Sequence, residues 1–244
     1  MEIIGNNLGL KELVSVEPSD IDENGVLNIP EGVEFISDFL MVNAREVDTG
    51  EGCEYIVNPI EGVTDVVKTI NVPASVTIVG KGAFATLSQL QEINFPKNSE
   101  LRKIERNAFT SCSSLQNITI PEGVVGLEER TFQGCKKLVN VNKEGEPFKY
   151  IDDWCFSGCD LKQIRVSKMC ASHDMSCYAF YNGNKDIELI IEEGTKRLII
   201  SPERLEEQLA TTTDLFEEPV KANGEEKPQK KGMKDRVKSA LFGL

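Results

Sequence analysis

The sequence predicts a β-rich solenoid of short stacked coils, and three observations support this fold class. A Phe that usually follows a small residue recurs at a nearly constant interval, at Phe84, Phe109, Phe132, Phe156 and Phe180, which lie 25, 23, 24 and 24 residues apart. Apolar positions on both sides of each Phe keep the same step, and several units close on an apolar residue followed by Pro. A repeat of this length is the signature of a stacked array, because one unit cannot bury its apolar face alone.

Each unit contains a segment with the pattern of a short strand. In Leu115–Ile120 the last three positions alternate apolar, polar, apolar, as expected for a strand with one buried face. Pro121 then ends the strand, because Pro has no N–H to donate to a ladder. Equivalent strands of successive coils would lie about 4.8 Å apart in a parallel strand ladder. Short helical or 3-10 turns are expected to complete each coil.

The repeat pattern weakens toward the start of the chain. Residues 1–28 are expected to form an N-terminal cap region, and residues 29–200 the solenoid, with regular coils at about 70–190. Two degenerate unit starts, Ile29–Val33 and Asn58–Val63, lack the Ala-Phe segment between them. We interpret this part as a divergent first coil.

The pattern also changes toward the other end. Residues 187–194 and 198–200 predict the last strands of the array. A Ser-Pro pair then introduces a short capping helix over residues 201–213, because Ser favours the N-cap and Pro the first helical position. Residues 214–244 are polar, with Pro and Gly but few core formers, which predicts a flexible tail.

The charge of this C-terminal region is split. Residues 201–226 carry 2 basic and 8 acidic side chains, whereas residues 227–244 carry 6 basic and 1 acidic. At about 100° per residue, apolar side chains of the basic part fall on one face, which makes it a candidate to dock on a partner groove or on an acidic lipid surface. The alternatives are a secretion or targeting signal and a tail that only solubilises the protein. The candidate docking residues are Met233, Val237, Leu241 and Leu244.

Composition excludes several functional classes. The net charge of −13 over 244 residues argues against a nucleic-acid binder, which needs a basic surface. A single His removes every mechanism that needs two imidazoles. No transmembrane run and no secretory signal pattern are visible, so we expect a cytoplasmic protein or one exported by a dedicated secretion system. The seven Cys are expected to be free thiols.

The repeat resembles the BspA-like leucine-rich repeat family, whose unit reads close to I-P-x-x-V-x-x-I-G-x-x-A-F-x-x-C-x-x-L-x-x-I. Residues 72–84 and 120–124 follow that pattern almost literally. The chain fits the family pattern well over about residues 70–165 and in degenerate form over about residues 25–200. The resemblance implies a right-handed, curved leucine-rich repeat solenoid that serves in binding or adhesion, with no enzymatic activity and no cofactor.

The outward side chains of the predicted strand ladder are the candidate partner-binding face, because a solenoid presents them as one extended surface. This face is rich in amides and has little charge. Its residues are Glu92, Asn94, Asn117, Thr119, Asn140, Asn142, Gln163 and Arg165. The alternative reading is that these side chains only solvate the sheet and that stacked Asn residues stabilise it.

The cysteines fall into two groups. Three of them, Cys112, Cys135 and Cys159, share one repeat position, which predicts a packed column of small apolar side chains. Cys170 and Cys177, with His173 between them, are candidates for a zinc site because Cys and His are zinc ligands. They are weak candidates because their spacing matches no standard zinc motif.

The sequence therefore predicts a non-catalytic protein-protein interaction module whose partner is unidentified. The first alternative is a surface adhesin or secreted effector exported by a route other than the general secretory pathway. The second is a zinc- or thiol-dependent enzyme centred on Cys170, His173 and Cys177.

Overall fold

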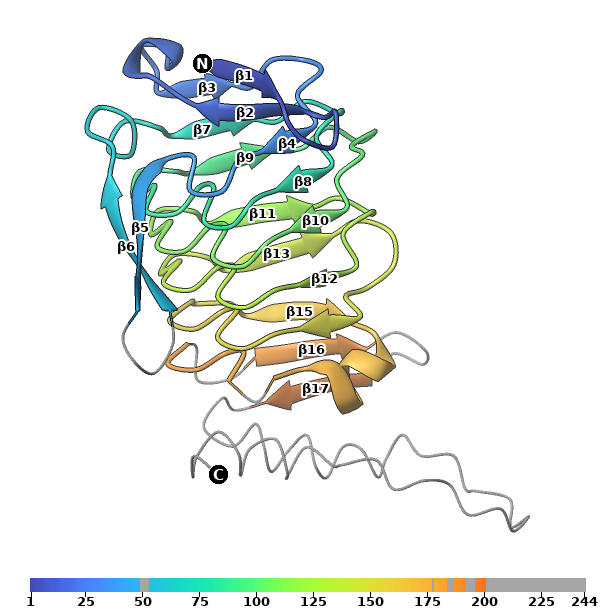
Figure 1. Ribbon diagram of the computed structural model, residues 1–244. Helices are drawn as coiled ribbons and strands as arrows, with labels where there is room; N and C mark the ends of the chain where they lie inside the picture. The colour runs from blue at the N-terminus through green and yellow to red at the C-terminus, as the bar shows by residue number, and fades with distance from the viewer. Residues whose placement is uncertain (49–52, 177, 184–186, 192–195, 201–244) are drawn as a thin grey trace, which may run out of the picture.

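The computed structural model describes residues 1–48, 53–176, 178–183, 187–191 and 196–200. The chain winds as a parallel β-solenoid, so the predicted strand ladder is confirmed (Figure 1). The segments that close each unit before Pro form the longer series of strands, here called the polar ladder. Its members are β3 (Val26–Asn28), β7 (Thr69–Asn71), β9 (Glu92–Asn94), β11 (Asn117–Ile120), β13 (Asn140–Lys143), β15 (Gln163–Val166) and β16 (Ile187–Ile191).

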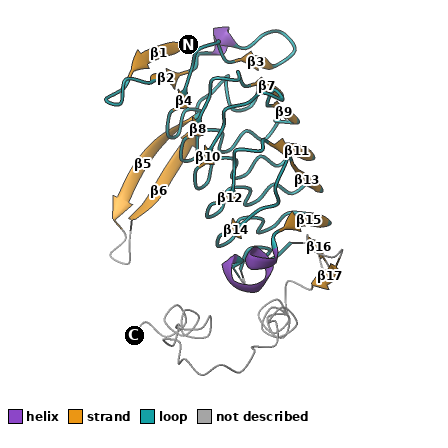
Figure 2. Cartoon of the chain, turned by 90° about the vertical axis from the view of Figure 1, so that its right-hand side faces the viewer, coloured by secondary structure: helices purple, strands orange, loops and turns teal. Residues whose placement is uncertain are grey.

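A second series of shorter strands runs along another side of the coils (Figure 2), and we call it the second ladder. Its members pair in parallel as β2-β4-β8-β10 and as β12-β14. They are β2 (Lys11–Ser15), β4 (Phe35–Ile36), β8 (Ile78–Val79), β10 (Lys103–Ile104), β12 (Gly126–Leu127) and β14 (Tyr150–Ile151). The sequence pattern did not predict these strands, because two residues are too few to show alternation.

Antiparallel strands stand at both ends of the array. At the N-terminal end β1 (Glu2–Gly5) pairs with β2, and a 3-10 turn, η1 (Pro18–Asp20), follows. At the other end β16 pairs with β17 (Lys196–Ile200). The predicted capping helix at 201–213 and the predicted tail at 214–244 lie outside the described residues.

The divergent first coil contains a complete turn. The backbone N–H of Met41 donates to the carbonyl of Ala83 at 3.2 Å, as that of Phe84 donates to Ala108 at 2.9 Å. Met41 therefore occupies the position that Phe holds in later coils. A hairpin of β5 (Val42–Asp48) and β6 (Cys53–Pro59) is inserted directly after it and stands beside the coils (Figures 1 and 2).

The core runs the length of the solenoid as columns of equivalent side chains. The five repeated Phe rings are fully buried. Successive rings lie 5.5, 5.3, 5.5 and 5.6 Å apart between centroids, within the usual range for aromatic contacts. Each coil thus buries its Phe against the coils on either side, which is why a single coil has no stable core of its own.

The coils turn through left-handed residues rather than through helices. One turn position has positive φ in successive coils, at Phe39 (55°), Gly82 (56°), Asn107 (61°), Arg130 (56°) and Trp154 (52°). The backbone N–H at this position donates to the next coil, as in Arg130 to Asp153 at 2.9 Å. Phe39, Gly82 and Asn107 make the same bond between coils. These bonds hold a conformation that costs L-residues free energy.

Helical structure is correspondingly scarce. The described residues contain only η1 and one π-helical turn, η2 (Cys170–Asp174). Among these residues, no helical segment has the length and apolar character needed to cross a membrane.

Candidate functional site

The predicted binding face lies on the outward side of the polar ladder. Six of its eight predicted residues are exposed, while Asn140 and Arg165 are half-buried. The parallel register aligns Asn117 with Asn140, Thr119 with Asn142, and Asn140 with Gln163. The intervening Ile118, Val141 and Ile164 face the core. The structure therefore brings the predicted residues together in two columns that run across the coils.

Neighbouring Asn side chains in these columns bind one another. Asn140 donates from Nδ2 to Oδ1 of Asn117 at 2.7 Å. At the N-terminal end Asn94 donates to Asn71 at 2.9 Å, and Asn71 donates to Asn28 at 2.7 Å. Sequence reasoning missed Asn28 and Asn71, although both stand in the same repeat position as Asn94. An amide has two donor hydrogens and two acceptor lone pairs, so each ladder Asn keeps capacity for a ligand.

Arg165 at the end of this face is fixed by the backbone beside it. Its Nη1 donates to the Lys143 carbonyl at 3.2 Å, and its Nη2 reaches the Gly145 carbonyl at 3.5 Å. The guanidinium is thereby anchored to the loop that follows β13.

Lys143 itself is a buried cation that the sequence analysis did not single out. It occupies the core-facing position held by Ile120 and Val166 in neighbouring coils, and its side chain is 6% exposed. Nζ donates to the carbonyls of Pro121 at 3.2 Å, Glu122 at 3.0 Å and Glu144 at 2.6 Å. Burial lowers the pKa of Lys143, and the nearby Glu122 carboxylate opposes that effect. The three carbonyls satisfy all three ammonium protons, so Lys143 ties two coils together.

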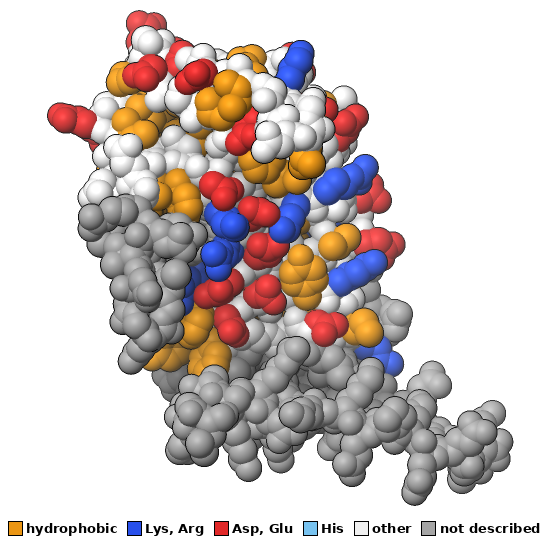
Figure 3. Space-filling model, viewed as in Figure 1, with side chains coloured by type: hydrophobic (Ala, Val, Ile, Leu, Met, Phe, Trp, Pro, Cys, Tyr) orange, Lys and Arg blue, Asp and Glu red, His pale blue; other side chains and the backbone are white. Residues whose placement is uncertain are grey.

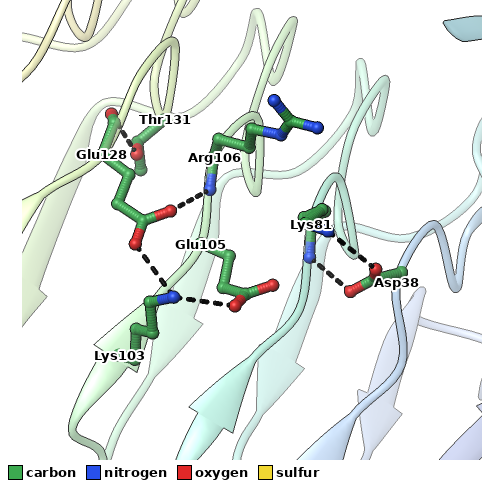
Figure 4. A network of polar contacts seen from close by, with 7 residues as sticks. All are labelled: Asp38, Lys81, Lys103, Glu105, Arg106, Glu128 and Thr131. Carbon is green, nitrogen blue, oxygen red and sulfur yellow. Dashed lines mark hydrogen bonds and ion pairs between the residues drawn. The ribbon is translucent and has the colours of Figure 1, made fainter.

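The second ladder carries a network of charged groups (Figure 4). Lys103 Nζ lies 2.8 Å from Glu105 Oε1 and 3.1 Å from Glu128 Oε1. The hydrogen bond to Glu105, followed by that to Glu128, raises the pKa of Lys103. Glu128 also accepts the backbone N–H of Arg106 at 3.0 Å, as Asp38 accepts that of Lys81 at 2.8 Å. These carboxylates satisfy backbone donors at the coil turns.

The surface of the second ladder is mixed in character. In Figure 3, which shows this side, Lys, Arg, Asp and Glu side chains gather near the middle of the face, with apolar side chains around them. Phe35, Ile78 and Tyr150 are half-buried there. The ring of Tyr150 lies over Gly126, where an added Cβ would approach Tyr150 Cε1 to 2.3 Å. Opposite charges pair across this face, so it has no single-sign field for recruiting a charged partner.

The column of cysteines is buried as predicted. Cys112, Cys135 and Cys159 are at most 3% exposed. Each thiol lies 3.1 Å from the carbonyl oxygen of a Phe in the preceding coil and donates to it. Burial raises the pKa of Cys135 and of Cys155 well above the usual value, which keeps these thiols protonated and unreactive.

Only some of the weak zinc candidates lie within the described residues. Cys170 is fully buried, and burial, with a smaller effect of Asp174, raises its pKa to about 12. Cys177 and the side chain of His173 lie outside the described residues. Among the residues that are described, no group of three or more His, Cys, Asp or Glu side chains could hold a metal ion. The predicted docking residues Met233, Val237, Leu241 and Leu244 likewise lie outside the described part of the chain.

Comparison with known proteins identifies the repeat. The model for a BspA type leucine-rich repeat region matches residues 64–188 in 6 copies. No curated protein matches the chain.

Two solved structures have similar folds. The pneumococcal vaccine antigen PcpA is 18% identical, with a TM-score of 0.58, over 82% of this chain and 54% of PcpA. A leucine-rich cell surface protein from Faecalibacterium prausnitzii is 17% identical, with a TM-score of 0.50, over 79% of this chain and 53% of that protein. The chain thus spans about half the length of each of these two structures.

Proposed function

We propose, since the chain belongs to the BspA type leucine-rich repeat family, that it is a non-catalytic module that binds another protein through the outward side chains of the polar ladder. The observation that carries this proposal is the ordering of that face before any partner arrives. Asn117 and Asn140 are aligned by strand register and joined by a 2.7 Å hydrogen bond. Groups that are already ordered lose less conformational entropy on binding, which favours affinity.

The polar ladder is a better candidate than the second ladder for a physical reason. On the second ladder, Lys103 is engaged by Glu105 and Glu128, so a partner would have to displace internal ion pairs. On the polar ladder, each amide retains donors and acceptors after its internal hydrogen bond. A polar peptide or loop of another protein can therefore bind there without disrupting the solenoid.

A pair of substitutions tests this proposal. Asn117→Arg together with Asn140→Arg places two long cations in the middle of the face without touching the core. Affinity capture from a lysate of the source cells, with quantitative mass spectrometry, is expected to show at least a roughly tenfold loss of the captured protein, as for residues that dominate an interface. Capture of the same protein at unchanged yield would contradict the proposal.

The matched control raises the net charge by the same amount away from the polar ladder. Val125 is 47% exposed and Glu100 is exposed, so Val125→Arg with Glu100→Gln is expected to fold normally and to leave capture unchanged. Circular dichroism of both variants separates loss of the binding face from loss of the fold.

A second candidate is display at a cell surface as an adhesin or secreted effector. This candidate rests on an analogy with the similar structure from Faecalibacterium prausnitzii, which is a cell surface protein. Antibody labelling of intact source cells, compared with permeabilised cells, tests this candidate. Labelling that requires permeabilisation would favour the cytoplasmic location expected from the sequence.

A further inference from the structure

The N-terminal end of the solenoid has an open sheet edge with exposed apolar side chains. Among the described strands, β1 pairs only with β2 and is the edge of its sheet. All four of its residues are exposed, with Ile3 at 40% and Ile4 at 44%. Leu8, in the turn to β2, is 82% exposed. An added Cβ on Gly5 would meet nothing within 4 Å, so this edge has room for an additional segment.

The same end of the molecule is strongly acidic. Residues 1–28 contain six acidic side chains and one basic side chain, a net charge of −5. Glu2, Glu17, Asp22 and Glu23 are exposed, and acidic side chains predominate at this end in Figure 3. Apolar contacts beside a negative field suit a basic, amphipathic segment. A second copy of the same acidic surface would be repelled.

We propose that this end of the solenoid binds the chain's own basic segment, residues 227–244, in an intramolecular contact. The segment carries 6 basic and 1 acidic side chains, a net charge of +5 that balances the −5 of residues 1–28. Its apolar residues Met233, Val237, Leu241 and Leu244 supply partners for Ile3, Ile4 and Leu8.

The connecting chain is long enough for this contact. The termini of the described solenoid lie at opposite ends of the array (Figure 1). The six steps between the seven strands of the polar ladder span about 29 Å at a spacing of about 4.8 Å. The predicted helix over residues 201–213 would be about 20 Å long, and a coil of the 13 residues 214–226 has a root-mean-square span of about 20 Å. Together they span about 28 Å. A tether that matches the distance maximises the effective concentration of the attached segment.

Two other parts of the chain compete for the basic segment. The sequence of β17, at the opposite end, contains Lys196 and Arg197, two charges of the same sign as the basic segment. Residues 201–226 carry a net charge of −6 and five large apolar residues, so their competition is decided by the cross-linking experiment below. Residues 1–28 combine negative charge, exposed apolar side chains and an open sheet edge.

Zero-length cross-linking of the full chain tests the proposal. A carbodiimide joins carboxylates to lysine amines that touch, and an equal mixture of ordinary and ¹⁵N-labelled protein distinguishes contacts within one chain from contacts between chains. The expected products join Lys230, Lys231 or Lys234 to Glu17 or Asp22 within one chain, and raised salt reduces them by screening. Products concentrated in residues 201–226, or products of mixed isotope composition, would overturn the proposal.

Charge reversal at exposed sites provides matched variants. Glu2→Lys with Glu23→Lys is expected to lower the yield of these products at Glu17 and Asp22 about fivefold, the scale of a few exposed ion pairs. Glu146→Lys with Asp160→Lys changes the net charge equally at other exposed positions and is expected to leave the yield unchanged. Leu8→Ser, at an exposed position with no core contact to lose, is also expected to lower the yield, because the proposed contact includes this side chain. Equal yields in all variants would refute the proposed surface.

Discussion

Replacement of a Phe in the middle of the ring column tests whether the coils are coupled by ring stacking or only by burial. Phe132 contacts the rings of Phe109 at 5.3 Å and Phe156 at 5.5 Å. Phe180 ends the column in the described structure, and its ring contacts that of Phe156 at 5.6 Å. Both side chains are fully buried, so a change to Leu removes similar area at each site.

The difference between the two variants therefore isolates the ring contacts. An aromatic pair contributes about 0.5–1.5 kcal/mol beyond its buried area. Phe132→Leu loses two such pairs and Phe180→Leu loses one, so the first variant is expected to lower the free energy of unfolding by about 1 kcal/mol more than the second. For a chain of this size, that difference corresponds to about 2–4 °C in Tm.

Urea unfolding, followed by the fluorescence of Trp154 and by far-UV circular dichroism, measures this difference. Trp154 is the only Trp and stacks on Tyr178 at 5.7 Å, so it reports on the coils between the two sites. Coincident curves from the two probes establish a single transition. The single variant Phe156→Leu and the double variant Phe132→Leu with Phe156→Leu complete a double-mutant cycle, which gives the coupling of this pair. An equal or larger loss in Phe180→Leu would refute ring coupling.

Three further outcomes are expected. In native protein at least five of the seven thiols resist a thiol-specific reagent that labels all seven in denaturant, because five described cysteines are buried; rapid labelling of more than two would contradict this. Gly126→Ala is expected to lower the free energy of unfolding by about 1–3 kcal/mol, because the added methyl group displaces the Tyr150 ring. In a Tyr150→Ala background the same change should lower the free energy of unfolding by less. An equal loss in both backgrounds would contradict the contact. The pKa of Lys103 lies above the ordinary 10.5 because its ammonium group pairs with Glu105 and Glu128. The stability that this pairing gives the folded protein is therefore fully present below about pH 10.5 and is lost as the pH rises through the raised pKa. The stability difference between the native protein and Lys103→Gln, from urea midpoints, is therefore expected to stay constant from neutral pH to about pH 10 and to shrink in stronger alkali; a difference that shrinks toward lower pH would contradict this sign.

The repeat itself was predictable because its signals are local and recur many times. The spacing of the Phe residues, the alternation in Leu115–Ile120 and the Cys position each predict burial, and the structure places these side chains in the core. The outward residues of the polar ladder were also predictable, since in a strand the buried Ile118 leaves its neighbours facing solvent. What those outward residues bind was not predictable, because a partner leaves no periodic pattern in the sequence.

Other features depend on contacts between residues that no local pattern connects. Met41 fills the Phe position of the first coil without sharing its sequence motif, and its place is set by the hydrogen bond to Ala83 in the next coil. Lys143 interrupts an apolar position and is tolerated because three carbonyls from two coils surround its ammonium group.

The sequence alone determines that this protein is a stack of coils of about 24 residues with Phe, Leu, Ile and Cys inside, since each coil repeats the same local pattern of burial. Only the tertiary structure decides that a second ladder forms, that Lys103 lies between two carboxylates, and that β1 leaves an open, apolar edge within an acidic surface. These features arise from the register between neighbouring coils, which brings together side chains more than 20 residues apart in the chain.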